Sequence, residues 1–272
     1  MKKKRVLIIS QEISPYLDYT NMGKICNALP KHLLNEGVEM RILTPRFGNV
    51  NERRHKLHEV VRLSGINIVM GDDDMPLIIK VASLPSVRIQ VYFLDNEEFF
   101  GRKYDFRDEK EKFYPDNAER MIFFCKGAME IVKKFAWPPD LIHCHGWMTS
   151  LIPLYMKTAY KKEPVFLKSK IVSSIYKNDF KETLNKNFGT LGKADGVTVK
   201  DFELFKPATN TALLEGAINY SDGVILGDEE TDKAVLDFIK AKKKPKLDFG
   251  NLDEDYLVDY VEFYKKLMTA KK

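Results

Sequence analysis

Apolar residues recur along the chain with two different spacings. Short apolar runs bounded by polar or turn residues predict β-strands at Arg5–Ser10, Glu39–Thr44, Asp140–His143, Ile171–Tyr176 and Gly223–Leu226. Between them, apolar residues three and four apart predict amphipathic helices at Met22–Glu36, Asp116–Phe135, Thr149–Tyr160, Ala212–Tyr220 and Glu229–Lys240. Strands that alternate with helices predict an α/β fold with a single doubly wound, mostly parallel and Rossmann-like sheet.

Three parts of the chain depart from this alternation. Period-two runs at Gly65–Met70, Leu77–Ala82 and Arg88–Phe93 predict a strand meander added to the sheet. Residues 177–211 show no clear period, so we expect a long, poorly packed excursion there. A basic patch at Lys242–Lys244 precedes a last amphipathic helix at Asp253–Met268.

The C-terminal helix leaves two arrangements open. We expect one domain over residues 1–240, followed by a basic tail and a C-terminal helix over residues 241–272. The helix either packs back on its own domain or covers an open cleft or a partner. The first arrangement is the simpler one, because an amphipathic helix must bury its apolar stripe against another element.

Composition narrows the functional classes. The 272 residues carry 44 basic and 39 acidic side chains, a net charge of +5, and 44% of them are hydrophobic, which is typical of a globular protein with a substantial core. Most of the basic residues are lysine rather than the bidentate arginine, so we expect no nucleic-acid partner. No apolar run approaches a membrane span, so we expect no membrane partner. Three distant cysteines without a CxxC pair predict reduced thiols and a cytoplasmic protein.

Common cofactor and metal motifs do not occur in the sequence. It contains no GxGxxG, GxxxxGK[ST], HExxH or GxSxG pattern, so we predict neither a cofactor nor a metal site. The acidic run Gly71–Asp74 is similar to the metal site of nucleotide-sugar enzymes, but it is typical of an exposed turn between strands. His55 and His58 stand three apart without a third ligand nearby, which favours two surface residues.

Two segments at the predicted carboxyl edge of the sheet carry the candidate chemistry. In the segment His143–Trp147, extended backbone directs His143 and His145 to one face and Cys144 to the other. A histidine there can bond a sugar hydroxyl or phosphate and Trp147 can stack on a sugar, whereas the alternative is a satisfied core histidine.

The other segment is the loop Glu12–Met22, which leads from the first predicted strand into the first helix. The helix dipole and free backbone donors at such a helix N-terminus favour an anion such as a phosphate. Gly23 allows close backbone approach there. The loop is therefore a candidate phosphate site.

Five ordered motifs run through most of the chain: Val6–Tyr16, Asn27–Lys31 with Gly37–Arg41, Tyr92–Asn96 with Phe100–Arg102, Tyr114–Arg120, and Asp140–Trp147. Together they resemble the N-terminal half of bacterial glycogen synthases and plant starch synthases. The resemblance implies one half of a two-domain GT-B fold and a retaining transfer of glucose from ADP-glucose to an α-1,4-glucan. It also implies donor or glucan contacts for four residues and leaves the catalytic residues unidentified; the four are Gly23, His145, Trp147 and Tyr176.

The chain departs from this family at the residues that meet the donor. Asp18 stands where the family has the lysine of a Lys-Thr-Gly-Gly signature, and Thr20 and Asn21 replace its glycines. An acidic side chain beside a diphosphate repels it, and added side chains block close backbone approach. Gly146 replaces an aspartate, Met148 replaces a polar residue, and Tyr176 replaces a histidine.

The family's second domain supplies most nucleotide contacts and the catalytic arginine, lysine and glutamate, and this chain ends where that domain would begin. We therefore expect a glucosyltransferase domain that is not self-sufficient, completed by a separate chain that supplies the second domain. The alternative is a noncatalytic glucan- or nucleotide-binding regulatory subunit, a pseudoenzyme that keeps only the fold.

Overall fold

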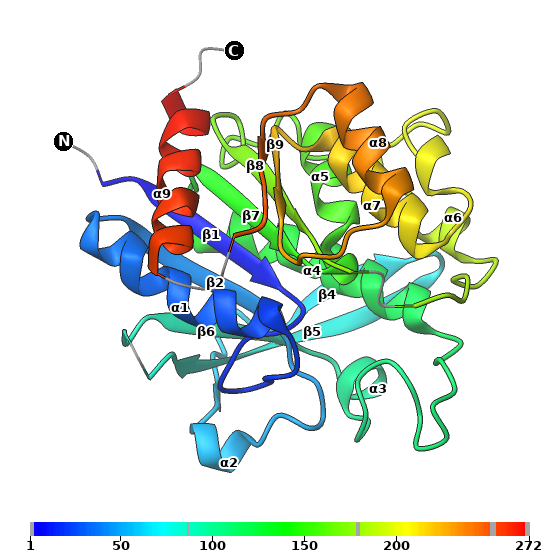
Figure 1. The fold of residues 1–272 in the computed structure, drawn as a ribbon. Helices are drawn as coiled ribbons and strands as arrows, with labels where there is room; N and C mark the ends of the chain where they lie inside the picture. The colour runs from blue at the N-terminus through cyan, green and yellow to red at the C-terminus, as the bar shows by residue number, and fades with distance from the viewer. Residues whose placement is uncertain (1–2, 86, 178–179, 251–253, 270–272) are drawn as a thin grey trace.

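A single mixed sheet organises the molecule (Figure 1). The computed structural model describes residues 3–85, 87–177, 180–250 and 254–269. Seven of its strands are parallel: β1 (Arg5–Ser10), β2 (Glu39–Pro45), β6 (Gln90–Asp95), β7 (Leu141–His145), β8 (Lys170–Ile175), β9 (Gly223–Leu226) and β10 (Lys246–Leu247). Their order in the sheet is β10-β9-β8-β7-β1-β2-β6. The predicted doubly wound, mostly parallel α/β fold is confirmed.

The predicted meander extends this sheet beyond β6. Strand β5 (Asp73–Ser83) runs antiparallel to β6, and it also pairs with β3 (His58–Glu59) and β4 (Ile66–Met70). Gly71 and Asp72 form the turn between β4 and β5, and the following Asp73 and Asp74 are exposed at the start of β5. The acidic run is therefore an exposed turn, as predicted.

Helices cover both faces of the sheet. Because crossovers between parallel strands are right-handed, α1 (Asn21–Asn35), between β1 and β2, lies on the face opposite α5 (Leu151–Lys157), between β7 and β8. Helix α9 (Glu254–Thr269) contacts α1 (Figure 1). The helices α4 (Asn117–Phe135), α7 (Asn210–Tyr220) and α8 (Lys233–Lys242) join α5 in one continuous layer. The C-terminal helix thus packs back on its own domain, and the simpler expectation for it is confirmed; Asp253 lies outside the described residues.

Short helical turns complete the connections. They are α2 (Glu52–His55), α3 (Glu97–Phe100), η1 (Trp147–Thr149), α6 (Phe188–Leu191) and η2 (Glu203–Phe205). His55 ends α2 and its ring lies 4.8 Å from that of Tyr16, whereas His58 is exposed in β3. Within the described residues, no group of three or more histidine, cysteine or acidic side chains could hold a metal ion.

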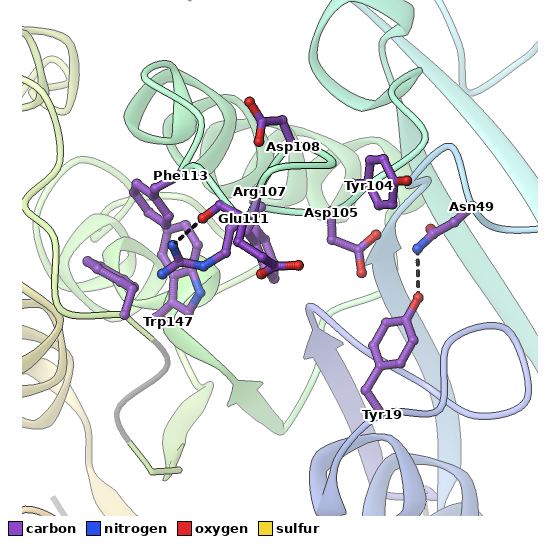
Figure 2. Close-up of a pocket in the computed structure, with 11 residues that line it drawn as sticks. Tyr19, Asn49, Tyr104, Asp105, Arg107, Asp108, Glu111, Phe113 and Trp147 are labelled. Carbon is purple, nitrogen blue, oxygen red and sulfur yellow. Dashed lines mark hydrogen bonds between the residues drawn. The ribbon is translucent and has the colours of Figure 1, made fainter.

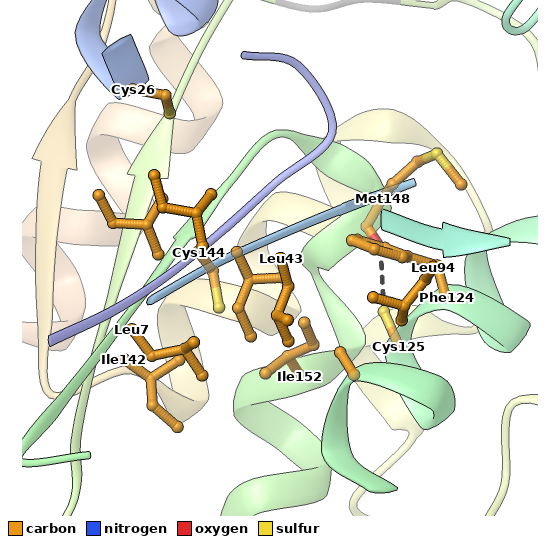
Figure 3. Close-up of a cluster of buried hydrophobic side chains, with 14 of the residues drawn as sticks. Leu7, Cys26, Leu43, Leu94, Phe124, Cys125, Ile142, Cys144, Met148 and Ile152 are labelled. Carbon is orange, nitrogen blue, oxygen red and sulfur yellow. Dashed lines mark hydrogen bonds between the residues drawn. The ribbon is translucent and has the colours of Figure 1, made fainter. Parts of the chain in front are cut away.

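Strand β7 divides its side chains between two environments. Cys144 lies with Leu7, Leu43 and Ile142 in the buried cluster that α4 and α5 cover (Figure 3). In the same cluster the Cys125 thiol donates to the carbonyl oxygen of Met148 at 2.9 Å. Alternation along the strand therefore places His143 and His145 on the other face, which α1 and α9 cover.

The expectation of a poorly packed excursion at residues 177–211 is wrong. Phe180, Phe188, Phe202 and Phe205 are all buried, and the ring of Phe202 lies 5.4 Å from that of Phe188 and 5.3 Å from that of Phe205. These aromatics sit in turns and single helical turns, so they reach the core without any periodic spacing. Residues 178 and 179 lie outside the described residues.

Candidate functional site

A cavity of about 510 Å³ opens at the carboxyl edge of the parallel strands (Figure 2). Its lining comes from the segments that follow five different strands: Tyr19 after β1, Asn49 after β2, Asp105 after β6, Trp147 after β7 and Phe180 after β8. Doubly wound sheets bind ligands at this edge, because the loops of neighbouring strands diverge there. The cavity is therefore the candidate site.

An aromatic cluster forms one side of the cavity. The Trp147 ring lies 5.1 Å from the ring of Phe106 and 5.0 Å from that of Phe180, and Phe113 stacks on Phe180 at 5.0 Å. Trp147 is only 1% exposed, whereas Phe106 and Phe113 are partly exposed. Trp147 therefore lies in the cavity wall, but its neighbours Phe106 and Phe113 offer most of the accessible ring surface, and its contact with a sugar stays a prediction.

The backbone conformation at position 146 favours glycine. It adopts a φ of +84°, where side chains are disfavoured, and a Cβ there would lie 2.4 Å from the Gln11 side chain. The Gln11 Oε1 atom in turn accepts from the Met148 N–H at 3.1 Å. A side chain at position 146 would therefore strain the backbone and require Gln11 to move.

His145 and Tyr176 lie in a buried hydrogen-bonded chain. His145 Nδ1 pairs with the Tyr176 hydroxyl at 2.7 Å, and His145 Nε2 pairs with His143 Nδ1 at 3.0 Å. His143 also bonds the Tyr264 hydroxyl of α9, and its Nε2 pairs with Ser174 Oγ at 2.7 Å. Both predicted binding residues therefore have protein partners, and neither lines the cavity.

Burial keeps both histidines neutral. Desolvation lowers the pKa of His145 to about 3, and desolvation together with the neighbouring His145 lowers the pKa of His143 well below its ordinary value. A nitrogen-to-nitrogen contact between two neutral rings requires one to donate and the other to accept. The pair thus acts as a structural link between β7 and α9.

The loop Glu12–Met22 supplies its own anion. Glu12 Oε1 accepts from the backbone N–H groups of Tyr19 and Thr20, each at 2.7 Å, and its Oε2 accepts from Thr20 Oγ1 at 2.9 Å. Thr20 also caps α1 by accepting from the Met22 N–H. A Cβ at Gly23 would lie 2.6 Å from Glu12 Oε1, so the close approach at Gly23 is made by Glu12.

A polar group that the motifs did not reveal lies on the other side of the cavity. The Tyr19 hydroxyl accepts from Asn49 Nδ2 at 2.7 Å, beside the carboxyl group of Asp105 (Figure 2). Asp105 belongs to a long segment after β6 with no periodic pattern. Its only signal in the sequence is its place after a strand of the parallel sheet.

The chain matches a known protein family and several curated relatives. The family described as starch synthase catalytic domain matches residues 5–240. The glycogen synthases of Chlorobaculum parvum and Chlorobaculum tepidum are 39% and 41% identical to the chain over 173 residues, which are 63% of this chain and 36% of each relative. The chain thus spans about a third of the length of these curated relatives.

A solved structure shows the same fold. The catalytic domain of starch synthase IV from Arabidopsis thaliana, bound to ADP and acarbose, superposes with a TM-score of 0.73 at 17% identity, over 91% of this chain and 51% of that one. In the described residues, no helix is long and apolar enough to cross a membrane. On its sequence match and its fold, the chain belongs to the starch synthase catalytic domain family.

Proposed function

We propose that this domain binds an α-1,4-glucan in the cavity and serves as the acceptor-binding half of a glucosyltransferase that uses ADP-glucose. The observation that carries the proposal is the cavity with its partly exposed rings of Phe106 and Phe113, placed at the carboxyl edge of a starch-synthase-type domain. Aromatic faces pack against the apolar faces of sugar rings, and nearby polar groups fix their orientation. The relatives are glycogen synthases, which supports a glucan as the ligand.

We expect this domain to bind the donor, ADP-glucose, only weakly. Transfer from a nucleotide diphosphate needs cations and free amides where negative charge develops. Here Asp18 is exposed in the loop, the backbone N–H groups of Tyr19 and Thr20 already donate to Glu12, and the side-chain Nδ2 of Asn21 donates to Asp228 at 3.1 Å. We infer that this domain does not transfer glucose unaided and needs a second GT-B domain to bind the donor. A separate chain as the source of that domain stays a prediction.

A second candidate function is a noncatalytic glucan-binding subunit. It is favoured by the burial of His145 and Tyr176, because side chains that are hydrogen-bonded to each other and to the core do not reach a substrate. The two candidates share the glucan and differ in whether glucose is ever transferred. They are therefore separated by an activity measurement on the completed enzyme.

Calorimetry with each ligand separately tests glucan binding, which both candidate functions share. We expect maltoheptaose to bind, ADP to bind weakly or not at all, and Phe113→Ala to weaken maltoheptaose about tenfold through the loss of one stacking ring. Phe135→Ala, which removes a partly buried ring that packs on Tyr92, is the matched control and should leave the affinity unchanged. Undetectable maltoheptaose binding would contradict the proposal.

A transfer assay tests whether the domain transfers glucose alone or only with a second domain. Radiolabelled ADP-glucose and maltoheptaose are supplied to the protein alone and to the protein mixed with the isolated second domain of a glycogen synthase. Incorporation by the protein alone, above that of a Phe113→Ala control, would overturn the inference that it is not self-sufficient. Incorporation only in the mixture favours the acceptor half over the noncatalytic subunit.

A further inference from the structure

Asp105 lines the cavity, and one of its two carboxyl oxygens has no partner within the described residues. Within the described residues, its Oδ1 atom is buried and has no hydrogen-bond partner. Figure 2 shows the Asp105 carboxyl group on the same side as Tyr19, Asn49 and Tyr104, away from Trp147. A buried acceptor that is left unpaired is costly and needs an explanation, and a ligand that donates a hydrogen bond is one.

Within the described residues, the charged neighbours of Asp105 do not pair with its Oδ1 atom. Arg120 on α4 directs its Nη1 to the backbone carbonyl of Asp105 at 2.5 Å and to Asn117 Oδ1 at 2.6 Å. The Tyr19 hydroxyl, from the loop after β1, and the Asn49 side chain, from the segment after β2, hydrogen-bond the Asp105 carboxyl group and lower its pKa, whereas Glu12 raises it. Burial outweighs the attraction of Arg120 and raises the pKa of Asp105 to about 6.

Among the described residues that line the cavity, Arg107 is the one basic side chain, and its charge is compensated. The Arg107 guanidinium forms a two-pronged pair with Glu182 at 2.7 and 2.9 Å, whereas Asp108 and Glu111 add acidic groups to the lining. An anionic ligand would therefore meet repulsion at this site. A neutral ligand rich in hydroxyl groups can instead donate to the carboxylate while its apolar face meets the aromatic rings.

We propose that Asp105 is a specificity-determining residue of the cavity, whose carboxylate accepts a hydrogen bond from a hydroxyl group of an uncharged sugar unit. The inference rests on the proposed glucan function and adds the residue that orients the sugar. The unpaired oxygen, the neighbouring Tyr19 and Asn49, and the aromatic rings on the other side together define the polar and apolar sides of one sugar site.

The test measures maltoheptaose affinity by calorimetry between pH 7.5 and 5.5. If the ionised carboxylate accepts the bond, protonation with a pKa of about 6 lowers the affinity of the wild-type protein about fourfold over this range. Asp105→Asn should bind about tenfold more weakly at pH 7.5, because a charge-assisted bond is lost, and its affinity should not change with pH. Circular dichroism at each pH confirms that the variants are folded.

The control variant replaces a different acidic residue of the same cavity. Asp108 also lines it, but its carboxylate accepts from the backbone N–H groups of Lys110 and Lys112 at 2.8 and 3.0 Å. Asp108→Asn should retain the wild-type pH profile. A wild-type profile in Asp105→Asn, or an equal loss in both variants, would overturn the inference while leaving glucan binding intact. If the wild-type protein binds no maltoheptaose at any pH, the proposed function fails and this inference fails with it.

Discussion

Acidification should destabilise the fold through the buried pair His143 and His145. Both are 0% exposed, and burial holds the pKa of His145 at about 3 and that of His143 well below its ordinary value. In the unfolded chain each histidine titrates near pH 6.5. Above that pH neither state binds a proton. As the pH falls below it, only the unfolded state takes up protons, so stability decreases toward the folded pKa.

The size of the effect follows from these pKa differences. Each pH unit below 6.5 costs about 1.4 kcal/mol for a histidine that stays neutral in the fold, so between pH 7 and 5 His145 removes about 2 kcal/mol, and His143 adds a loss of the same sign. Asp105 acts with the opposite sign. Its folded pKa is raised to about 6, so the folded state takes up a proton over this range and regains about 1 kcal/mol. The two histidines together outweigh Asp105, so the fold loses stability between pH 7 and pH 5.

Urea unfolding at pH 7 and pH 5 measures this loss. His145→Asn should lower stability at pH 7, because the hydrogen bond to Tyr176 is lost, and it should reduce the pH-dependent loss by about 2 kcal/mol. His58→Asn, at an exposed position in β3, is the matched control and should keep the wild-type loss. An equal pH dependence in the wild-type protein and His145→Asn would refute the reasoning.

Three further changes test separate contacts. Asp105→Asn should raise the free energy of unfolding at pH 7 by about 1–3 kcal/mol, because it removes a carboxylate whose pKa is raised to about 6; a loss of stability in urea would contradict this. Gly146→Ala should lower the free energy of unfolding by about 2 kcal/mol or more, because of the φ of +84° and the contact with Gln11, and this is measured as a lower melting temperature. Gly189→Ala, with nothing within 4 Å of its Cβ position, is the control and should cost far less. Glu12→Ala should cost about 1.5–3 kcal/mol in urea unfolding by freeing two loop amides, and an unchanged midpoint would show that water replaces the carboxylate without cost.

Strand positions could be predicted closely because the parallel strands are buried on both faces. The predicted bounds of β1 and β9 are those observed, since a continuous apolar run stops where the chain leaves the sheet. The segment 177–211 could not be predicted in the same way. Its buried aromatics, such as Phe202, lie in turns, where burial leaves no period in the sequence.

The site shows a sharper limit of sequence reasoning. Alternation in β7 correctly places His143 and His145 on one face, but it does not say which helix covers that face. The tyrosines of α9 come from more than a hundred residues away, and Tyr264 turns the pair into core residues. Asp105 was missed for the opposite reason, because a single acid in an irregular loop has no pattern that distinguishes it.

The positions that we predict to depart from the family, Gly146 and Thr20 among them, are linked through neighbouring contacts. Gln11 precedes Glu12, and its side chain fills the space beside Gly146, so an acid at position 146 would displace Gln11 next to the loop that Glu12 holds. In that loop Thr20 both donates to Glu12 and caps α1, so a glycine there would remove the cap as well as a side chain. Neighbouring substitutions that share partners are not additive. An acid at position 146 or a glycine at position 20 would therefore destabilise this segment, and we expect the two effects to be coupled rather than additive.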